Sequence, residues 1–451
     1  MIYALIKMVH TFSFDDKYYL FDSESGSLHI CDALTCEVIK KINGEKYNLE
    51  GVSEEVIKDI EEEIEELKQS GVLYAKQVEE VPMKSSDIKA LCLHICHDCN
   101  LSCKYCFAGK GKYKGKSEYM SFEVGKKAVD FLIENSGKRQ ILEMDFFGGE
   151  PLLNLDVVKK IVAYAREEGK KKGKIFLFTL TTNGVLLNEE TAKWLNKEME
   201  NVVLSIDGRK EVHDGVRKTI NGKGSYDVIV ENIKNFVKMR KDKHYYVRGT
   251  FTNKNLDFSN DVLFLADMGL KEISLEPVVL DKNDELYISE DMLPKIKEEY
   301  RKLAKEYLER KKRGENLFNF FHFQIDLKGG VCLKKRISAC GAGNEYFSVT
   351  PNGDIFPCHQ FASNPAYKMG NVFDGKLDDN IRDIFRNANL FTRDKCKDCF
   401  AKYHCSGGCP ANNINFSGDI NKPYEITCEM MKARTECAMH IYSEKLSEEE
   451  K

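Results

Sequence analysis

Three cysteines within eight residues constrain this chain more than any other feature of its sequence. They are Cys99, Cys103 and Cys106, in the pattern C-x3-C-x2-C, and a phenylalanine follows the last of them. This asymmetric spacing lets one loop bind three corners of a cubane iron-sulfur cluster and leaves the fourth iron without a protein ligand. A zinc knuckle or unrelated buried thiols are the alternatives, but zinc sites favour paired C-x2-C units and four ligands. The spacing therefore predicts a cluster with one open iron.

Length and composition indicate a globular protein of several domains. The chain has 451 residues, of which 42% are hydrophobic and 31% charged, which suits about two to four domains. No apolar run reaches the roughly 18 to 20 residues that span a bilayer, and the apolar start is too short for a signal peptide. A net charge of -4 from 68 basic and 72 acidic residues gives no general attraction to nucleic acid or to a membrane. We therefore expect a cytoplasmic protein without either partner.

The cysteine count also points to metal ligation. Sixteen cysteines in a chain with no export signal are not expected to form a disulfide framework, because the cytosol keeps thiols reduced. A chain that held several clusters would be sensitive to oxygen, which suggests an anaerobic setting. Five cysteines outside the motifs are interpreted as ordinary thiols with no proposed role: Cys31, Cys36, Cys92, Cys96 and Cys437.

From residue 88 onward, predicted strands alternate with amphipathic helices, which is typical of a parallel sheet covered by helices. With the cysteine loop after the first strand, this α/β pattern over residues 85–315 resembles the partial (β/α)6 barrel of radical S-adenosylmethionine (SAM) enzymes. In that family SAM chelates the open iron and is cleaved to a 5'-deoxyadenosyl radical, and functional residues lie at the C-terminal ends of the strands. Strands are expected at 90–95, 142–147, 174–181, 201–206, 245–251 and 272–276, and helices at 121–135, 156–171, 188–196, 226–241, 260–268 and 286–313.

The second expected strand ends in Gly148, Gly149, Glu150 and Pro151. The glycines leave no side chain where the backbone approaches a ligand, and the proline favours a turn into a helix. This segment resembles the GGEP motif of the radical SAM family, which is expected to receive the methionine amino group of SAM. A plain turn from strand to helix is the alternative.

Other strand ends are expected to face the same pocket. Thr182 and Asn183 end the third strand. The resemblance suggests that Ser205 and Asp207, at the end of the fourth, contact the SAM ribose. Arg217 is placed like an arginine that pairs with the SAM carboxylate, a geometry that suits the guanidinium fork. A turn or a surface ion pair is the alternative for each.

The last third of the chain, residues 316–451, contains more thiols than one zinc ion can use. The pattern resembles the SPASM domain of radical SAM enzymes that modify peptides and proteins, which holds two auxiliary 4Fe-4S clusters and would bring the total to three. A zinc ribbon is the alternative for the thiols between 396 and 409. The family's connectivity implies an outer cluster on Cys396, Cys399, Cys405 and Cys428, and an inner cluster on Cys340, Cys358 and Cys409.

The inner set lacks a fourth ligand. Sulfatase maturases have a further cysteine where this chain has Tyr346, and an aspartate just after the second SPASM cysteine where it has His359-Gln360. Both differences count against a sulfatase maturase. Cys332 is a candidate fourth ligand, but we favour an open iron that a peptide thiolate could bind.

The stretch at 317–323 is rich in aromatic residues and is expected to be buried.

Residues 1–84 contain no cluster motif and are expected to form a separate domain, followed by a linker at 82–86. The order of its elements resembles the winged-helix recognition element of ribosomal-peptide maturases, in which a leader peptide pairs with an exposed strand edge. A structural or DNA-binding winged helix is the alternative. The expected elements are strands at 9–14, 17–22 and 26–31, helices at 32–42 and 53–70, and a last strand at 72–74.

The residues at 97–101 and 358–361, together with the N-terminal elements, resemble most closely the maturases of cysteine-rich SCIFF peptides, which are sactisynthase-like enzymes. That resemblance implies a thioether link between a cysteine sulfur and the α-carbon of an acceptor such as threonine. It also implies a precursor peptide whose leader binds the N-terminal domain, and a reductant such as ferredoxin or flavodoxin. The alternatives are a carbon-carbon crosslink, a side-chain oxidation as in sulfatase maturation, and an iron-sulfur regulator that binds DNA.

Overall fold

The computed structural model describes residues 9–78, 87–327 and 336–449. Cys332, the candidate fourth ligand of the inner set, lies outside the described residues, as does the expected linker at 82–86. Among the residues described, none of the helices has both the length and the apolarity needed to cross a membrane.

A sheet of eleven strands forms the centre of the described structure, in the order β12-β11-β10-β8-β7-β6-β4-β13-β14-β15-β16. Neighbouring strands from β12 to β13 are parallel, and the rest are antiparallel. All six strands expected between 90 and 276 are present, which confirms the mixed α/β fold with a parallel sheet. The bounds are β4 (Ala90–Cys96), β6 (Ile141–Gly148), β7 (Ile175–Thr182), β8 (Asn201–Ser205), β10 (Tyr245–Phe251), β11 (Glu272–Pro277), β12 (Asn319–Phe320), β13 (Tyr346–Val349), β14 (Asp354–Phe356), β15 (Gly370–Asn371) and β16 (Lys376–Leu377).

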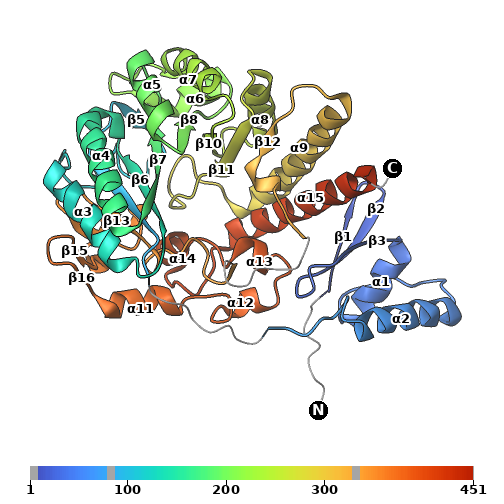
Figure 1. Cartoon of the computed structure of the whole chain (residues 1–451). Coiled ribbons are helices and arrows are strands. Elements are labelled where there is room, and N and C mark those ends of the chain that lie inside the picture. The colour runs from blue at the N-terminus through green and yellow to red at the C-terminus, as the bar shows by residue number, and fades with distance from the viewer. Residues whose placement is uncertain (1–8, 79–86, 328–335, 450–451) are drawn as a thin grey trace.

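The C-terminal third of the chain adds strands to this sheet at β4. Strand β13 pairs in parallel with β4, so that Ser348 lies opposite Cys92. Strand β12 joins the opposite edge beside β11. One sheet therefore continues through the expected boundary at residue 315, and the first strand, which precedes the cysteine loop, lies between β6 and β13 (Figure 1).

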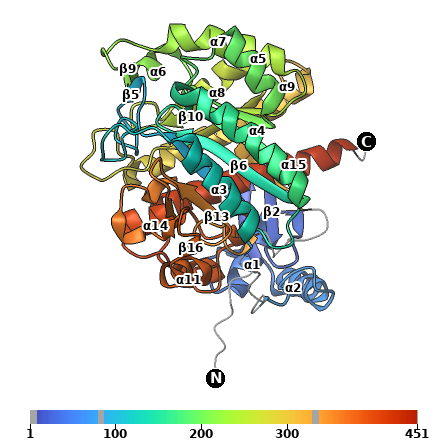
Figure 2. The same ribbon diagram turned by 60° about the vertical axis from the view of Figure 1, so that its left-hand side comes forward.

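Helices cover the outer face of the sheet, as Figure 2 shows for α3 and α4. Side chains cap several helices where the sequence predicts a start; Ser121, for example, accepts a hydrogen bond from the Val124 N–H. The short helix α6 was not expected from the sequence. The bounds are α3 (Phe122–Asn135), α4 (Leu155–Lys172), α5 (Glu189–Glu198), α6 (Lys210–Val216), α7 (Tyr226–Arg240), α8 (Phe258–Asp267) and α9 (Leu293–Arg313).

Two expectations for this part need correction. The long helix begins at Leu293 rather than at residue 286, because Pro294 occupies its first turn and lacks the N–H that a longer helix would need. The stretch at 317–323 is only partly buried: Phe318, Phe320 and Phe323 pack in the core, whereas Leu317 and Phe321 are 52% and 50% exposed.

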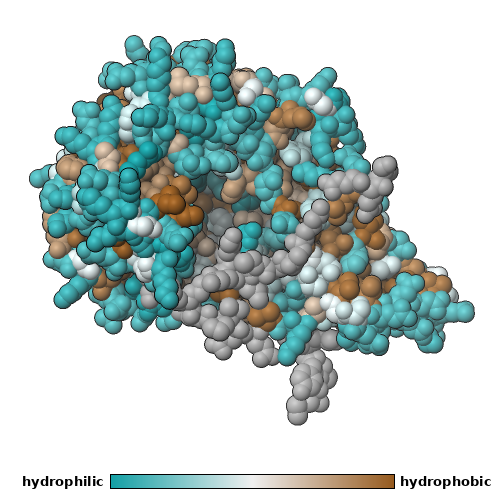
Figure 3. All heavy atoms as spheres, viewed as in Figure 1, coloured by the Kyte–Doolittle hydropathy of each residue, from teal (hydrophilic) through white to brown (hydrophobic). Residues whose placement is uncertain are grey.

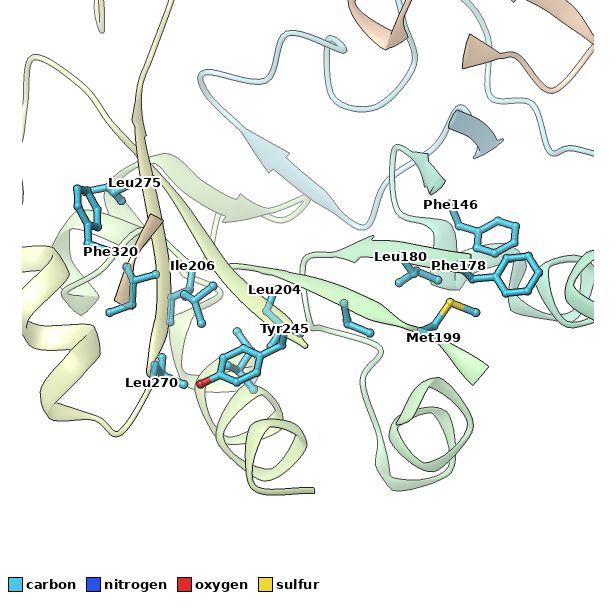
Figure 4. Packing of buried hydrophobic residues seen from close by; sticks show 14 of the residues in the cluster. Phe146, Phe178, Leu180, Met199, Leu204, Ile206, Tyr245, Leu270, Leu275 and Phe320 are labelled. Atoms are coloured by element: carbon cyan, nitrogen blue, oxygen red, sulfur yellow. The ribbon is translucent and has the colours of Figure 1, made fainter. Parts of the chain in front are cut away.

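The hydrophobic core lies between the sheet and its helices. Figure 4 shows Phe146, Phe178 and Leu180 of neighbouring strands lying close to Met199, and farther along the sheet Leu204, Ile206 and Leu275. The face of the molecule seen in Figure 3 is largely hydrophilic, with smaller hydrophobic groups.

The N-terminal module has its own small core and a three-stranded antiparallel sheet in the order β1-β2-β3. The expected strands and helices are confirmed except the last strand at 72–74. That segment forms bends, because Tyr74 has a φ of +52°, outside the region in which a strand continues. The bounds are β1 (Val9–Phe14), β2 (Lys17–Asp22), β3 (Leu28–Cys31), α1 (Ala33–Ile42) and α2 (Glu54–Gln69).

The C-terminal helix α15 (Glu425–Glu449) joins the three parts of the chain (Figure 1). It packs along α9 and reaches β1, and the Tyr19 hydroxyl lies 2.8 Å from His440 Nδ1. A second connection is the ion pair between the nearly buried side chains of Glu24 and Lys402. In the described part of the C-terminal third, the shorter helices before α15 are α11 (Asp379–Asn387), α12 (Asp394–Lys397), α13 (Lys402–Cys405) and α14 (Pro410–Ser417).

Candidate active site

One cavity of about 530 Å³ lies at the C-terminal ends of the parallel strands and is shared by the two halves of the chain. Most residues that the sequence marks as functional line it. Asp207, Cys340, Cys358, Cys396 and Cys399 do not. The marked residues in the cavity wall are Cys99, Cys103, Cys106, Gly148, Gly149, Glu150, Thr182, Asn183, Ser205, Arg217, Cys405, Cys409 and Cys428.

A two-stranded ribbon holds the cysteine loop. Strand β5 (Leu101–Cys103) pairs antiparallel with β9 (Arg217–Thr219), which places Cys103 opposite Arg217. Asn183 Nδ2 donates to Asn100 Oδ1 at 2.7 Å and lies 3.7 Å from Cys99 Sγ. Burial raises the pKa of Cys99 to about 12, so this thiol must lose its proton when it binds a metal.

The turn at the end of β6 contains Gly148 and Gly149. Because these residues have no side chains, the turn packs directly against the backbone that leads into the cysteine loop. The Gly149 N–H donates to the Cys96 carbonyl, and the Glu150 N–H to the Asp98 carbonyl. A Cβ atom at Gly149 would lie 1.8 Å from the Asp98 carbonyl oxygen, and Gly148 has a φ of +130°. The two glycines therefore fix the position of the loop, a role that the sequence interpretation did not include.

Glu150 is buried, and three hydrogen bonds orient its carboxylate. Its Oε1 accepts from the Thr182 hydroxyl at 2.8 Å and from the Leu152 N–H at 3.1 Å, and its Oε2 accepts from the Asn183 N–H at 2.8 Å. Burial raises the pKa of Glu150 to about 7, although these hydrogen bonds act in the opposite direction. The site therefore holds a carboxyl group that titrates near neutral pH.

Asp207 lies behind the cavity wall and acts on it through Tyr105. Its Oδ2 accepts from the Tyr105 hydroxyl at 2.6 Å, and its Oδ1 accepts from the Thr250 N–H at 3.1 Å. Arg217 Nη1 donates to the same Tyr105 hydroxyl at 2.8 Å. Arg217 Nε is buried and has no hydrogen-bond partner among the described residues, so it can donate to a ligand in the cavity.

The thiols of the C-terminal third fall into two electrostatic groups. Burial raises the pKa of Cys428 to about 12, and Cys405, Cys396 and Cys399 add to that rise. Burial likewise raises the pKa of Cys358, where the added contributions come from Cys409, Cys340 and Cys92. The first group contains the expected outer set and the second the expected inner set with Cys92 added; that these thiols hold two clusters stays a prediction.

Tyr346 lies beside the inner group: burial raises its pKa, and Cys92 and Cys358 add to that rise. Within the described ranges, no three Cys, His, Asp or Glu side chains lie closely enough together to hold a single metal ion.

Sequence reasoning missed two side chains that shape this site. Tyr105 lies between two cysteines of the motif, so its position could have suggested a role. Arg434, on α15, lines the cavity but has no local sequence signal, because only the path of the helix brings it there.

Comparison with known families identifies two parts of the chain. Residues 93–255 match the radical SAM superfamily, and residues 340–400 match the iron-sulfur cluster-binding domain called SPASM. These domains imply SAM and 4Fe-4S clusters as cofactors. The residues present fit them, since three thiols of one loop line a cavity with the unpartnered Arg217 Nε.

Two curated relatives extend the likeness. An uncharacterized protein, MJ0907, from Methanocaldococcus jannaschii is 31% identical over 218 residues, which cover 48% of this chain and 70% of the relative. A cysteine-type anaerobic sulfatase-maturating enzyme from Clostridium novyi is 27% identical over 361 residues, which cover 74% of this chain and 91% of the relative.

Two solved structures share the fold. The structure of anSMEcpe with bound AdoMet has a TM-score of 0.66 at 22% sequence identity. The match covers 78% of this chain and 93% of the anSMEcpe chain. Streptococcus suis SuiB bound to S-adenosylmethionine has a TM-score of 0.54 at 17% sequence identity. The match covers 93% of this chain and 98% of the SuiB chain. By these matches, residues 93–255 form a radical SAM domain and residues 340–400 a SPASM domain, and the chain is homologous to peptide and anaerobic sulfatase maturases.

Proposed function

We propose that this chain forms a thioether link between a cysteine sulfur and the α-carbon of an acceptor such as threonine in a ribosomally made, cysteine-rich precursor peptide. The observation that supports this most is the shared cavity of about 530 Å³, whose wall contains thiols of both the C-x3-C-x2-C loop and the SPASM domain. A peptide in this cavity would contact the radical source and the auxiliary thiols at once. Joining a sulfur to a carbon requires that the radical source and the auxiliary thiols reach the same peptide.

The proposed cofactors are SAM and three 4Fe-4S clusters. The first would be held by Cys99, Cys103 and Cys106, and the auxiliary two by the inner and outer SPASM sets. SAM bound to the first cluster supplies a carbon radical, and the protein binds and orients the reactants. The proposed SAM contacts are Gly148, Gly149, Glu150, Thr182, Asn183, Ser205 and Arg217, with Asp207 orienting Arg217 through Tyr105.

Replacing Gly149 by alanine should weaken SAM binding at least about tenfold. The new Cβ would lie 1.8 Å from the Asp98 carbonyl oxygen, so the turn and the cysteine loop must move apart, and a small misplacement of a binding group costs affinity. Equilibrium dialysis of radiolabelled SAM measures the effect. Gly215→Ala is the matched control, because a Cβ there meets no atom within 4 Å. Unchanged affinity in the Gly149 variant would contradict the proposed position of SAM.

SAM binding should weaken as the pH falls below about 7. Burial raises the pKa of Glu150 to about 7, and only its ionised form can balance the SAM ammonium group. Below that pKa the affinity should fall by up to about tenfold per pH unit. The same dialysis at several pH values tests this. Glu150→Gln should bind SAM weakly at every pH, and a wild-type affinity independent of pH would count against this role for Glu150.

For the N-terminal part, we propose a winged-helix recognition domain over residues 1–84 that binds the leader of the precursor. Strand β3 is an edge strand, since it pairs with β2 alone among the described strands, and Ile30 on it is 52% exposed. An extended peptide can add to such an edge. Residues 85–315 and 316–451 would be the radical SAM and SPASM domains, and a ferredoxin or flavodoxin in the cytoplasm would supply electrons.

The test of the proposed function is anaerobic incubation of the reconstituted protein with SAM, a strong reductant and a candidate cysteine-rich precursor. Mass spectrometry should show 5'-deoxyadenosine, and a peptide that has lost two hydrogens and has one thiol blocked from alkylation. If deoxyadenosine forms from the SAM while the peptides stay unchanged, the radical SAM core stands and the thioether substrate is wrong.

Side-chain oxidation as in sulfatase maturation is a second candidate. The Clostridium novyi relative, of which this chain covers 91%, favours it. Tyr346 and His359, which replace a cysteine and an aspartate of the sulfatase maturases, count against it. The same mass spectra separate the two, because oxidation of a side chain to a carbonyl leaves no thioether after alkylation.

A further inference from the structure

Arg248 carries a positive charge into the cavity and forms no hydrogen bond or ion pair through its guanidinium within the described part of the chain. It lies on β10, in register with Ser205 of β8 and Ser274 of β11, and its exposed side chain contributes to the cavity wall. A guanidinium that donates no hydrogen bond within the protein has its donors free for an anion in the cavity.

A second guanidinium in the same wall is already neutralised. Arg434 of α15 donates from Nη1 to Glu276 Oε2 at 3.1 Å. The same nitrogen lies 3.0 Å from His322 Nδ1. Because a guanidinium is only a donor, Nδ1 must be the acceptor, so the His322 ring is neutral and has its proton on Nε2, which lies 3.2 Å from the Ser274 hydroxyl.

Among Arg248, Arg434 and Glu276, the positive charges outnumber the negative charges by one. Arg248 and Arg434 contribute two positive charges. Glu276 contributes one negative charge, because burial, which opposes its ionisation, is outweighed by Arg434 and Arg248, and its pKa falls to about 2. Arg217, the proposed partner of the SAM carboxylate, is a separate group on β9. Arg248 is thus available to a carboxylate other than that of SAM.

We propose that Arg248, held next to the Glu276–Arg434 pair, binds a carboxylate of the peptide substrate and so positions the residue to be modified. The carboxylate belongs to an acidic side chain near that residue or to the C-terminus of the peptide. A guanidinium binds a carboxylate through two parallel hydrogen bonds, which fixes the orientation of the peptide as well as its distance. This subsite rests on the proposed function, because it takes a peptide to be the substrate.

The test uses the full-length reconstituted protein with saturating SAM under anaerobic conditions, and three synthetic peptides. The first is acetyl-Thr-Gly-Cys-Gly-Glu-amide, the second has Gln in place of Glu, and the third is the Gln peptide with a free C-terminal carboxylate. Titration calorimetry measures each dissociation constant. We expect the wild type to prefer one of the two carboxylate peptides over the neutral one by about tenfold.

Variants of this site should change the binding of the carboxylate peptides in different directions. Arg248→Gln should reduce the preference to less than about twofold, and Arg248→Lys should retain part of it, because the charge remains and the fork is lost. Glu276→Gln should increase the affinity for the preferred carboxylate peptide, since it removes the competing anion. Lys110→Gln, a matched loss of charge at another exposed residue of the cavity wall, should leave the preference unchanged.

Three results would overturn the proposal. One is equal affinity of the wild type for all three peptides, including no binding of any. Another is a loss of preference in Lys110→Gln as large as in Arg248→Gln. The third is a weaker SAM affinity in Arg248→Gln with the peptide preference intact, which would assign Arg248 to the SAM carboxylate. Formation of 5'-deoxyadenosine by the wild type is measured separately, and its absence would count against the proposed function instead.

Discussion

Replacing Cys99 by alanine is expected to lower 5'-deoxyadenosine formation by at least about a thousandfold. Three thiols are the fewest that can hold a cubane cluster with one open iron, so the loss of one should release that cluster or prevent SAM from binding to it. Cys99 Sγ also accepts a hydrogen bond from the Leu101 N–H at 3.4 Å, which indicates that the loop is already shaped around it. Chromatography of the nucleoside products and iron analysis measure the two effects.

Cys437→Ala is the matched control for this variant. Cys437 is buried on α15, it does not line the cavity, and the sequence interpretation gives it no role. Its substitution should leave deoxyadenosine formation within about twofold of the wild type, since it removes a small buried group without touching the site. A Cys99 variant that kept both its iron and its activity would rule out the C-x3-C-x2-C loop as the SAM-binding centre.

Replacing Cys409 by alanine should separate the two halves of the reaction. Cys409 lines the shared cavity and is proposed to hold the inner cluster with Cys340 and Cys358, whereas its substitution leaves the C-x3-C-x2-C loop unchanged. We therefore expect deoxyadenosine to form at a rate within about threefold of the wild type, while thioether formation falls by at least about a hundredfold. Quantifying nucleoside and crosslinked peptide in the same samples measures the ratio.

The retained deoxyadenosine serves as the internal control for folding, because a misfolded protein would lose both products. Cys31→Ala, a change in the N-terminal module away from the cavity, should keep the two products in the wild-type ratio. Crosslinked peptide at wild-type amounts from the Cys409 variant would show that the inner auxiliary thiols take no part in forming the bond.

Local patterns predict much of this fold and site. The six strands between 90 and 276 were predictable because buried parallel strands are short apolar runs, and the covering helices because their apolar residues recur with the helical period. The radical SAM and SPASM domains were predictable because their cysteines recur at short spacings along the chain, whereas the binding of clusters by these cysteines stays a prediction. The expected strand at 72–74 and the helix start at 286 were wrong because the φ of Tyr74 and the place of Pro294 in a helix depend on the surrounding structure.

By itself, the sequence determined the alternation of strands and helices, the three-thiol loop and the seven SPASM thiols, since each depends on residues close together in the chain. Only the tertiary structure decided that β13 extends the sheet beside β4 and that the two halves share one cavity. It also decided that Arg434 pairs with Glu276, 158 residues away. Such contacts depend on how packed elements bring distant residues together, and a periodic pattern records only which face of an element is buried and not what it will meet.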